Sequence, residues 1–361
     1  MDIQTRLDLI RGVGEEIITA TELHHLLETK THPHAYDGFE PSGLAHLPFG
    51  VFRPLLLKDL LKAGVKFTLY LADYFAWINK KMGGDLEKIR KVGEYFIEVW
   101  KAAGVDTTKV KFVWNSEVMD KEYWKKVLLI SKNTSLKRTT RALTIMGRKE
   151  GELQETAQYF YPMMQTADIF HLKADICQLG LDQRRANMLA REVGPKLGWH
   201  KPVVVSHHML MGLEGAKTPE GYETDAVYDA EISSKMSKSK PSSAIFVHDS
   251  TEEIKKKISG AYCSPKDVIN NPMLDYSKHL ILRKFGQMEI KRDKKFGGDL
   301  FFEKYEDLEK IFLEGKLHPM DLKNTVADYL DQMISPVRTH FTKTKKARDL
   351  VEFVKKQEIT R

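Results

Sequence analysis

The chain has 361 residues, enough for one large domain or two ordinary ones, and its 42% hydrophobic and 30% charged residues exclude a disordered or fibrous protein. Its two cysteines, Cys177 and Cys263, exclude a disulfide framework, and its net charge is +7. No apolar run approaches the ~20 residues that cross a bilayer, and the first residues lack the apolar core of a signal peptide, so we expect a cytoplasmic protein.

Most of the excess positive charge lies in the last third of the chain. Residues 251–361 hold 23 basic and 18 acidic side chains, which accounts for +5 of the +7. A basic tail on a near-neutral body favours an anionic partner such as RNA, through contacts with phosphate. A solvated, lysine-rich surface explains the charge equally well, so charge alone does not identify a partner.

Strand-like and helix-like segments alternate up to residue 206. The first thirty residues read as helical, with a capping box formed by Thr19 and Glu22. We expect strands at 35–40, 66–72, 109–115, 175–180 and 202–206, and helices at 51–63, 85–103, 120–132, 136–148 and 183–197. Strands separated by helices imply parallel strands with crossover helices, hence an α/β fold with a doubly wound sheet.

The character of the chain changes after this alternating region. Residues 213–242 are rich in Gly, Ser, Lys, Thr and Pro, which indicates a linker or a mobile loop. A second capping box, Ser250 with Glu253, then opens a mostly helical region. We therefore expect two domains, 1–245 and 246–361.

Ligands of open α/β sheets bind beyond the carboxyl ends of the strands, so the loops there are the first candidates. In segment 39–50 the small residues Ser42 and Gly43 let a backbone approach a ligand, and the helix start offers free N–H groups to a phosphate near His46. A turn with a capping histidine fits this segment as well. Neither the P-loop nor the GxGxxG pattern occurs.

Two further segments carry polar side chains in a regular pattern. Tyr161, Gln165 and Asp168 are spaced i, i+4 and i+7, which places them on one stripe of an otherwise apolar helix. If buried, the stripe needs partners, and a ligand with an amine and a hydroxyl would supply them; a stripe facing solvent fits the spacing equally well. In 233–243, Lys235 and Lys238 lie in a loop that could close over a polyphosphate, although basic loops are common.

Taken together, these segments resemble one family. FEPSG with His46, LAD (71–73), YPMMQTAD, GLDQR (180–184), SKMSKS and LHPMDLKN (317–324) occur in the order seen in tyrosyl-tRNA synthetases of class I, in their archaeal and eukaryotic branch. The resemblance covers nearly the whole chain. It implies a Rossmann-like catalytic domain at 1–245, with the KMSKS loop at 233–241, and a smaller, mainly α-helical anticodon-binding domain at 246–361.

The resemblance also implies roles for individual residues. The residues matching the tyrosine site are Tyr36, Tyr161, Gln165, Asp168 and Gln183, with Tyr36 and Asp168 on the substrate hydroxyl. Those matching the ATP site are Gly38, Gly43, His46, Gly180, Asp182, Lys235 and Lys238, of which His46, Lys235 and Lys238 are the catalytic ones. Those matching tRNA contacts are Arg141 and Arg184 for the acceptor stem, and Phe296, His318 and Asp321 for the anticodon.

The implied reaction is tyrosine activation by ATP followed by transfer of the tyrosyl group to tRNA(Tyr), in a homodimer. ATP would bring Mg²⁺ with it, and no structural metal is expected, because the paired histidines 24–25 and 207–208 lack carboxylate or cysteine partners at ligand spacing. A tryptophan-specific relative is disfavoured, since Tyr36 and Asp168 suit a phenol.

One departure from the family pattern supports an alternative. The family's His-(Ile/Leu)-Gly-His appears here as His46-Leu47-Pro48-Phe49. Proline is tolerated in the first turn of a helix, but it adds bulk where glycine lets adenine approach, and Phe49 cannot donate a hydrogen bond. The alternative is a synthetase paralogue that has lost activation and acts as an RNA-binding protein.

Overall fold

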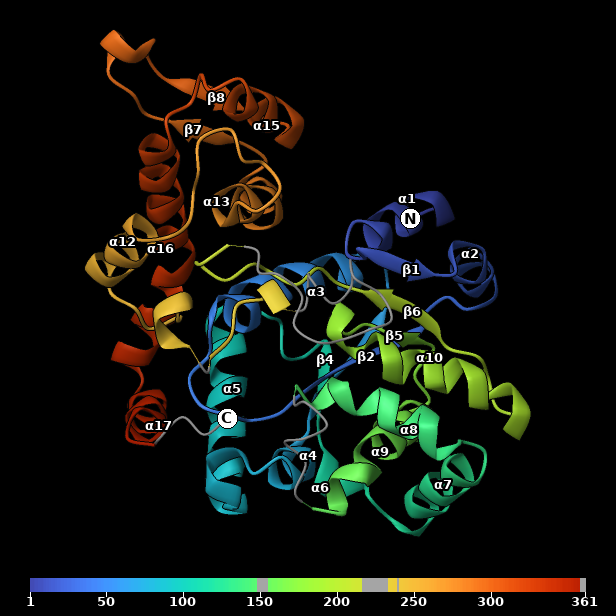
Figure 1. Cartoon of the computed structure of the whole chain (residues 1–361). Helices are drawn as coiled ribbons and strands as arrows, with labels where there is room; N and C mark the ends of the chain where they lie inside the picture. The colour runs from blue at the N-terminus through green and yellow to red at the C-terminus, as the bar shows by residue number, and fades with distance from the viewer. Residues whose placement is uncertain (148–154, 216–232, 239, 358–361) are drawn as a thin grey trace.

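The computed structural model describes residues 1–147, 155–215, 233–238 and 240–357 (Figure 1). Its N-terminal part is built on a six-stranded sheet in the order β1-β6-β5-β2-β3-β4. The strands are β1 (Glu16–Ile18), β2 (His34–Phe39), β3 (Lys66–Leu71), β4 (Val110–Trp114), β5 (Ile176–Cys177) and β6 (Val203–Ser206). All neighbouring strands from β2 through β6 pair in parallel, and β1 pairs antiparallel with β6 at the edge of the sheet. The expected doubly wound α/β sheet is therefore confirmed.

Alternate residues of the strands enter two different cores. In β2, Ala35 belongs to one core and Tyr36 to the other, and Val205 and Val204 of β6 divide in the same way. Continuous apolar strands of this kind are typical of a parallel sheet that is covered on both faces. Because of this alternation, Tyr36 of β2 and Tyr70 of β3 lie on the same face of the sheet.

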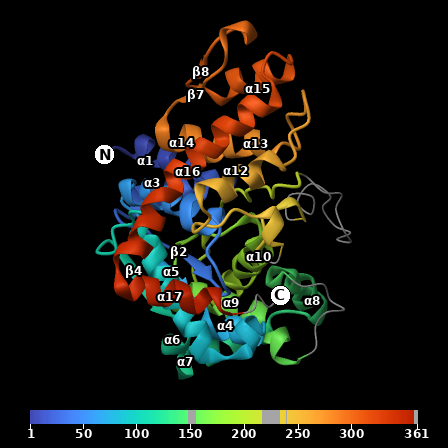
Figure 2. The same cartoon turned by 90° about the vertical axis from the view of Figure 1, so that its left-hand side faces the viewer.

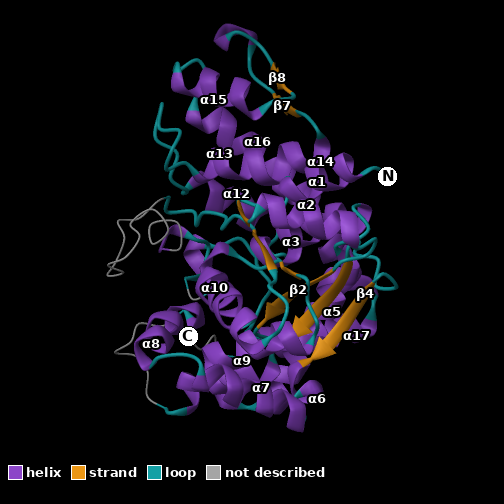
Figure 3. Ribbon diagram, turned by 90° about the vertical axis from the view of Figure 1, so that its right-hand side faces the viewer, coloured by secondary structure: helices purple, strands orange, loops and turns teal. Residues whose placement is uncertain are grey.

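Helices cover both faces, and Figure 3 shows the strands between them. The first face packs on α1 (Ile3–Arg11), α2 (Ala20–Thr29), α3 (Arg53–Lys62) and α5 (Leu86–Ala102). The second packs on α7 (Lys121–Lys132), α9 (Ala157–His171) and α10 (Arg184–Val193), with α8 (Leu136–Ala142) against α9. Short helices α4 (Asp73–Ile78) and α6 (Asn115–Val118) follow β3 and β4.

The C-terminal part is mainly helical and shares its core with the first face of the sheet. Its elements are α12 (Thr251–Ser259), α13 (Pro272–Tyr276), α14 (Arg283–Phe285), α15 (Tyr305–Leu313), α16 (Pro319–Lys343), α17 (Lys345–Lys355) and a hairpin of β7 (Met288–Ile290) and β8 (Leu300–Phe302). Figure 2 shows α16, about 37 Å long at 1.5 Å per residue, running from this part toward α17, which packs on α5.

The structure differs from the expected elements in several places. The first thirty residues are not wholly helical, because Glu15 N–H donates to Ser206 O and the next residues add β1 to the sheet edge. The helix expected at 51–63 begins earlier, with a π-helical turn η1 (Pro48–Phe52) before α3. The helix expected at 136–148 breaks after Ala142 into a 3₁₀ turn, η3 (Leu143–Met146), and Arg148 lies outside the described residues.

The region after β6 is described only in part. Of the expected loop 213–242, residues 216–232 and 239 lie outside the described structure. On its far side the chain pairs with the loop after β2, where Leu47 N–H donates to Ile245 O at 2.8 Å and Val247 N–H donates to Ala45 O at 3.0 Å. No helix among the described residues is long and apolar enough to span a membrane.

Gly93 in α5 provides a test of this packing. A Cβ atom built on Gly93 would lie 2.3 Å from the Trp114 ring of β4. Helix propensity alone favours Gly93→Ala by about 1 kcal/mol, but overpacking against the half-buried Trp114 ring costs about 1–3 kcal/mol. We expect Gly93→Ala to lower the free energy of unfolding in a urea titration, whereas Glu94→Ala, on the exposed side of α5, should change it by less than about 0.5 kcal/mol. A stabilised Gly93→Ala protein would contradict the packing.

Candidate active site

The candidate site lies where the sheet changes direction. From β2 the chain builds β3 and β4 on one side and β5 and β6 on the other, so the carboxyl ends of β2 and β5 form the switch point at which α/β sheets bind ligands. Side-chain and backbone contacts join three of the expected loops there: Lys238 contacts Ser42, Lys235 contacts Asp182, and His46 forms a β-bridge with Phe246. The loops are distant in sequence and adjacent in space.

Asp168 is the centre of a buried hydrogen-bond network on α9. Its Oδ1 accepts from Tyr70 Oη at 2.7 Å and from Tyr123 Oη at 2.9 Å, and the side-chain amide of Asn115 donates to Tyr70 Oη at 2.6 Å. Both phenols bind the same carboxylate oxygen, which leaves Oδ2 to a further donor. The Tyr36 hydroxyl is buried nearby and has no hydrogen-bond partner among the described residues.

Burial controls the protonation of this network. It raises the pKa of Asp168 well above its usual range, and the hydrogen bonds from Tyr70 and Tyr123 act in the opposite direction. Burial also raises the pKa of the Tyr36, Tyr70 and Tyr123 hydroxyls, so all three remain protonated donors at neutral pH. A ligand hydroxyl placed between Tyr36 and Asp168 would satisfy polar atoms that otherwise cost about 1–3 kcal/mol each.

The remaining polar residues of α9 continue this buried stripe. Tyr161 Oη donates to Glu40 Oε1 at 2.7 Å, and Gln165 Nε2 donates to Gln183 Oε1 at 3.1 Å. All three stripe residues, Tyr161, Gln165 and Asp168, are buried, so the interpretation of a solvent-facing stripe is wrong. Glutamate and glutamine oxygens at this end of the stripe can accept hydrogen bonds from an amine.

The two lysines of the loop after residue 233 are held at the other side of the switch point. Lys235 Nζ lies 2.5 Å from Asp182 Oδ2, and Lys238 Nζ lies 3.5 Å from Ser42 Oγ. Burial raises the pKa of Asp182, but Lys235 and Arg53 outweigh it and the net shift is downward, so this carboxylate is ionised. Ser239, the last residue of KMSKS, lies outside the described residues.

Lys238 is partly desolvated by aromatic rings. Its ammonium lies 4.6 Å from the centroid of Phe96 and 5.8 Å from that of Phe49. Burial, together with Lys81 and Arg53, lowers the pKa of Lys238 to about 7. The pKa of His46 is also held well below its usual range, by burial and by the neighbouring cation of Lys238, so the imidazole is neutral.

The unusual Pro48-Phe49 pair belongs to the core. Phe49 is 4% exposed, and its ring packs on Phe39 at 5.1 Å and on Phe96 at 4.2 Å between centroids. Pro48 occupies the first turn of η1, where a missing N–H costs nothing. The Phe49 side chain therefore fills the space between η1 and α5 instead of the space expected for a nucleotide.

The three glycines expected near the nucleotide differ in whether their surroundings or their backbone conformation demand the absence of a side chain. A Cβ on Gly180 would lie 2.6 Å from Asp182 Oδ1 and 2.8 Å from Met209 Sδ, so the side chains of Asp182 and Met209 would have to move to admit it. Gly43 has a positive φ of 90° and open space beside it. A Cβ on Gly38 would make only ordinary contact, at 3.8 Å from Tyr70, so packing does not demand glycine there.

The expected tRNA residues lie in two places outside the pocket. Arg141 is exposed at the end of α8. Arg184, at the start of α10, forms an ion pair with Glu16 of β1, in which its Nε donates to both carboxylate oxygens. Phe296 is 63% exposed in the turn between β7 and β8. His318 caps α16 through its Nδ1 atom, and Asp321 lies in the first turn of that helix.

One hydrogen bond links the segments that carry the expected anticodon residues Phe296, His318 and Asp321. Arg292, just before the turn that carries Phe296, donates to Lys316 O at 2.9 Å, two residues before His318. The turn between β7 and β8, which carries Phe296, therefore lies beside the start of α16, which carries Asp321 and is capped by His318.

Sequence reasoning missed several residues of the site. Tyr70, Asn115, Tyr123 and Glu40 contact the expected residues but were not singled out, and neither was the Asp37–Arg53 pair beside Tyr36, at 3.4 Å. Burial raises the pKa of Asp37 to about 7 despite Arg53. Asn115 and Glu40 follow strands directly, so the rule that loops at carboxyl ends hold the site could have found these two.

The chain is similar to known proteins over most of its length. The family model of class I tRNA synthetases (W and Y) matches residues 28–335. Tyrosine--tRNA ligase 1, cytoplasmic, of Arabidopsis thaliana is 43% identical over 364 residues, which cover 100% of this chain and 90% of the relative. Tyrosine--tRNA ligase of Thermococcus kodakarensis is 44% identical over 372 residues, covering 98% and 99%.

A solved structure extends the similarity to the whole fold. The tyrosyl-tRNA synthetase from Pyrococcus horikoshii, complexed with L-tyrosine, superposes with a TM-score of 0.88 and 41% identity, over 98% of this chain and 100% of that one. A family model that matches most of the chain, relatives above 40% identity over nearly full length, and the shared architecture lead to one conclusion. The chain belongs to the class I tyrosyl-tRNA synthetase family.

Proposed function

We propose that the chain activates tyrosine with ATP, giving tyrosyl-AMP and pyrophosphate, and then transfers the tyrosyl group to the 3′-terminal adenosine of tRNA(Tyr). The observation that carries this function is the buried Asp168 carboxylate, which has one oxygen engaged by two phenols beside the unpartnered hydroxyl of Tyr36. A phenol is the ligand group that can donate to Asp168 and accept from Tyr36 at once.

The amino acid lies along α9 in this proposal. Its ring hydroxyl meets Tyr36 and Asp168, and its amino group meets Tyr161, Gln165 and Gln183, with Glu40 supplying negative charge close to Tyr161. Phenylalanine would leave the buried polar atoms of Tyr36 and Asp168 unsatisfied, and that desolvation cost disfavours it. An indole N–H can donate but cannot accept, so tryptophan is disfavoured by the Tyr36 hydroxyl.

ATP, arriving with Mg²⁺, lies across the switch point. Gly43 and Gly180 admit its backbone contacts, Asp182 accepts from the ribose, and His46, Lys235 and Lys238 contact the phosphates. The tyrosine carboxylate attacks the α-phosphate in line and pyrophosphate leaves. Little covalent chemistry falls to the protein, which acts by positioning the reactants and by balancing the negative charge that shifts to the leaving group.

The observation that suggested an inactive paralogue has a structural explanation in this arrangement. It rested on Pro48 and Phe49, and Phe49 is packed into the core, where its ring lies against Lys238. Neither residue removes a group that the proposed chemistry uses.

We further propose how tRNA and a second subunit bind. Phe296, His318 and Asp321 would grip the anticodon by stacking and hydrogen bonding, and Arg141 and Arg184 would contact the acceptor stem. The catalytic domain would be 1–245 and the anticodon-binding domain 246–361.

The large exposed apolar side chains of α7 and α8, Trp124, Leu128 and Leu136, support a homodimer through that face. A cytoplasmic location is proposed because the Arabidopsis relative is named cytoplasmic.

ATP–pyrophosphate exchange tests the activation step directly. Purified protein is assayed with tyrosine, with phenylalanine, with tryptophan and without amino acid. We expect exchange with tyrosine alone. No exchange in folded protein, with or without added tRNA, would reject activation and return the RNA-binding alternative.

Tyr70→Phe tests the hydrogen-bond network behind Asp168. The change removes a donor to Asp168 and the acceptor of Asn115 without changing the ring, at a cost of about 1–2 kcal/mol. We expect the KM for tyrosine in the exchange assay to rise about 5- to 30-fold, with a smaller change in the KM for ATP. Tyr159→Phe, on the exposed face of α9, is the matched control and should behave like the wild type. Equal KM values for Tyr70→Phe would remove Tyr70 from tyrosine recognition.

The lowered pKa of Lys238 predicts proton uptake when ATP binds. A lysine with a pKa of about 7 is mostly neutral at pH 8, and an adjacent triphosphate raises that pKa, so the lysine gains a proton on binding. Calorimetric titration with ATP at pH 8, in buffers of different ionisation enthalpy, should show net proton uptake that disappears in Lys238→Met and persists in the control Lys240→Met. Proton release, or uptake unchanged in Lys238→Met, would contradict this assignment.

A further inference from the structure

Tyr95 of α5 joins the segment that carries His46 to the segment that follows the KMSKS loop. Its hydroxyl oxygen accepts a hydrogen bond from Ala45 N–H at 3.1 Å and lies 2.7 Å from His248 Nε2. Ala45 directly precedes His46 in the chain, and His248 directly follows the segment 245–247, which pairs with the loop after β2. Tyr95 is completely buried, and the proposed reaction gives it no role.

Burial fixes the direction of these two hydrogen bonds. It raises the pKa of the Tyr95 hydroxyl above its usual range and lowers the pKa of His248 to about 3. The phenol is therefore protonated and the imidazole is neutral, so Tyr95 donates its proton to His248 Nε2 and accepts from Ala45 with a lone pair. One hydroxyl thus satisfies a backbone donor and a side-chain acceptor at once.

The orientation of His46 depends on its backbone. Its Nδ1 atom is buried and has no hydrogen-bond partner among the described residues. The backbone on either side of it is held in place, since Leu47 N–H donates to Ile245 O and Val247 N–H donates to Ala45 O. The hydrogen bond from Ala45 N–H to Tyr95 completes this attachment. The segment 45–47, fixed in this way, directs the imidazole.

Aromatic packing connects Tyr95 to the second catalytic segment and to α16. Phe96, the next residue of α5, has the Lys238 ammonium 4.6 Å from the centroid of its ring. Tyr95 and His248 both pack edge-on against Phe341 of α16, with 5.5 and 4.8 Å between centroids. Two successive residues of α5 therefore support the two segments that carry the proposed phosphate contacts.

We propose that Tyr95 is a positioning residue of tyrosine activation, which holds Ala45 and thereby directs the His46 side chain toward the phosphates of ATP. Tyr95 contacts neither substrate in this arrangement and acts through His46. A small displacement of a group that contacts the reacting atoms is enough to slow a reaction, because the reactive geometry is narrow. The inference rests on the proposed function and extends it from residues that contact the substrates to one that orients such a contact.

Tyr95→Phe tests this role, because it removes the hydroxyl and keeps the ring that packs on Phe341. Tyrosyl-AMP formation is followed in a single turnover, and a burst titration counts the active sites, so unfolded protein does not change the rate per site. We expect this rate to fall about tenfold. The KM for tyrosine should stay within about twofold of the wild-type value, because the Tyr36 pocket lies on the other face of the sheet. Tyr329→Phe is the matched control, since the Tyr329 hydroxyl also accepts a backbone N–H at 3.1 Å, from Glu289 in the C-terminal part.

A double variant separates positioning from general support of the fold. In a His46→Ala background, Tyr95→Phe should slow the reaction by less than about twofold, since the group that Tyr95 positions is gone. The proposal is overturned by an unchanged rate per site in Tyr95→Phe, by an equal loss in Tyr329→Phe, or by a loss that persists in full without His46. Wild-type protein that forms no tyrosyl-AMP would reject the proposed function itself, and this inference with it.

Discussion

The candidate site depends on one costly arrangement, a carboxylate buried under a sheet with phenols as its hydrogen-bond donors. Asp168 receives hydrogen bonds from Tyr70 and Tyr123, neither of which carries a charge that could offset its burial. Burying a carboxylate without a charged partner costs free energy, and a further hydrogen-bond donor lowers that cost. A ligand hydroxyl would satisfy Asp168 and the unpartnered Tyr36 hydroxyl together, and that gain is the physical basis that we propose for selecting a hydroxyl-bearing ring.

The core on the opposite face of the sheet supports the lysines proposed for the second half of the chemistry. Phe49, which breaks the family's motif, packs with Phe39 and Phe96 and gives Lys238 an aromatic surface to rest on. This surface lowers the cost of burying the ammonium group but does not neutralise it. Lys235 instead rests on Asp182, a residue proposed for the ribose side. Both lysines are thus held at the position that we propose for the phosphates, Lys235 by an ion pair and Lys238 by aromatic rings.

The sequence predicted the parts of this site that have a local pattern. The i, i+4, i+7 spacing placed Tyr161, Gln165 and Asp168 on one stripe, and the family motifs supplied His46 and the KMSKS lysines. Burial of the stripe could not be decided from periodicity, because it depends on α7 and β3 covering α9. Tyr70 escaped notice because it lies in the apolar run of β3, where a tyrosine resembles another core residue. Tyr123 escaped notice because it lies among charged residues at the start of α7, a pattern typical of a surface.

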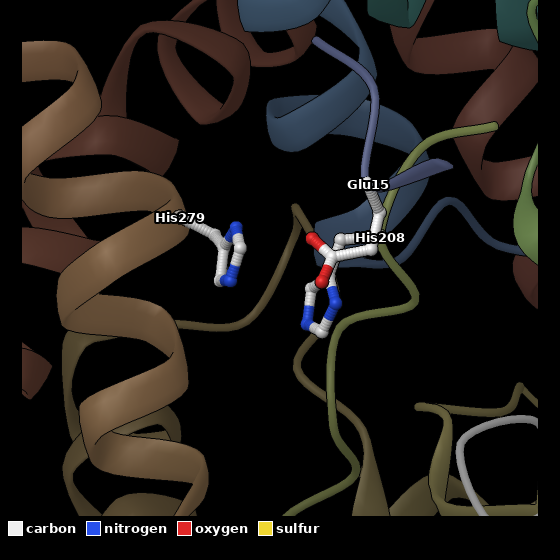
Figure 4. Close-up of side chains that lie close together, drawn as sticks. All are labelled: Glu15, His208 and His279. Carbon is white, nitrogen blue, oxygen red and sulfur yellow. The ribbon is translucent and has the colours of Figure 1, made fainter. Parts of the chain in front are cut away.

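Local sequence patterns could not predict the features that depend on contacts between distant segments. β1 is three residues long and exists because β6 offers an open edge. Glu15, His208 and His279 come from three distant segments (Figure 4), and the two histidine rings stack on one another while Asp275 accepts a hydrogen bond from His208. Contacts of this range follow from the topology of the sheet and not from spacing along the chain.

The affinity ratio of tyrosine to phenylalanine tests the central claim, that buried Asp168 selects the ring hydroxyl. Calorimetric titrations of wild-type protein and of Asp168→Ala would measure both amino acids under the same conditions. Two buried polar groups left unsatisfied by phenylalanine predict a wild-type preference of about a hundredfold or more, reduced to less than about tenfold in Asp168→Ala. An unchanged ratio in a folded Asp168→Ala protein would show that the selection lies elsewhere.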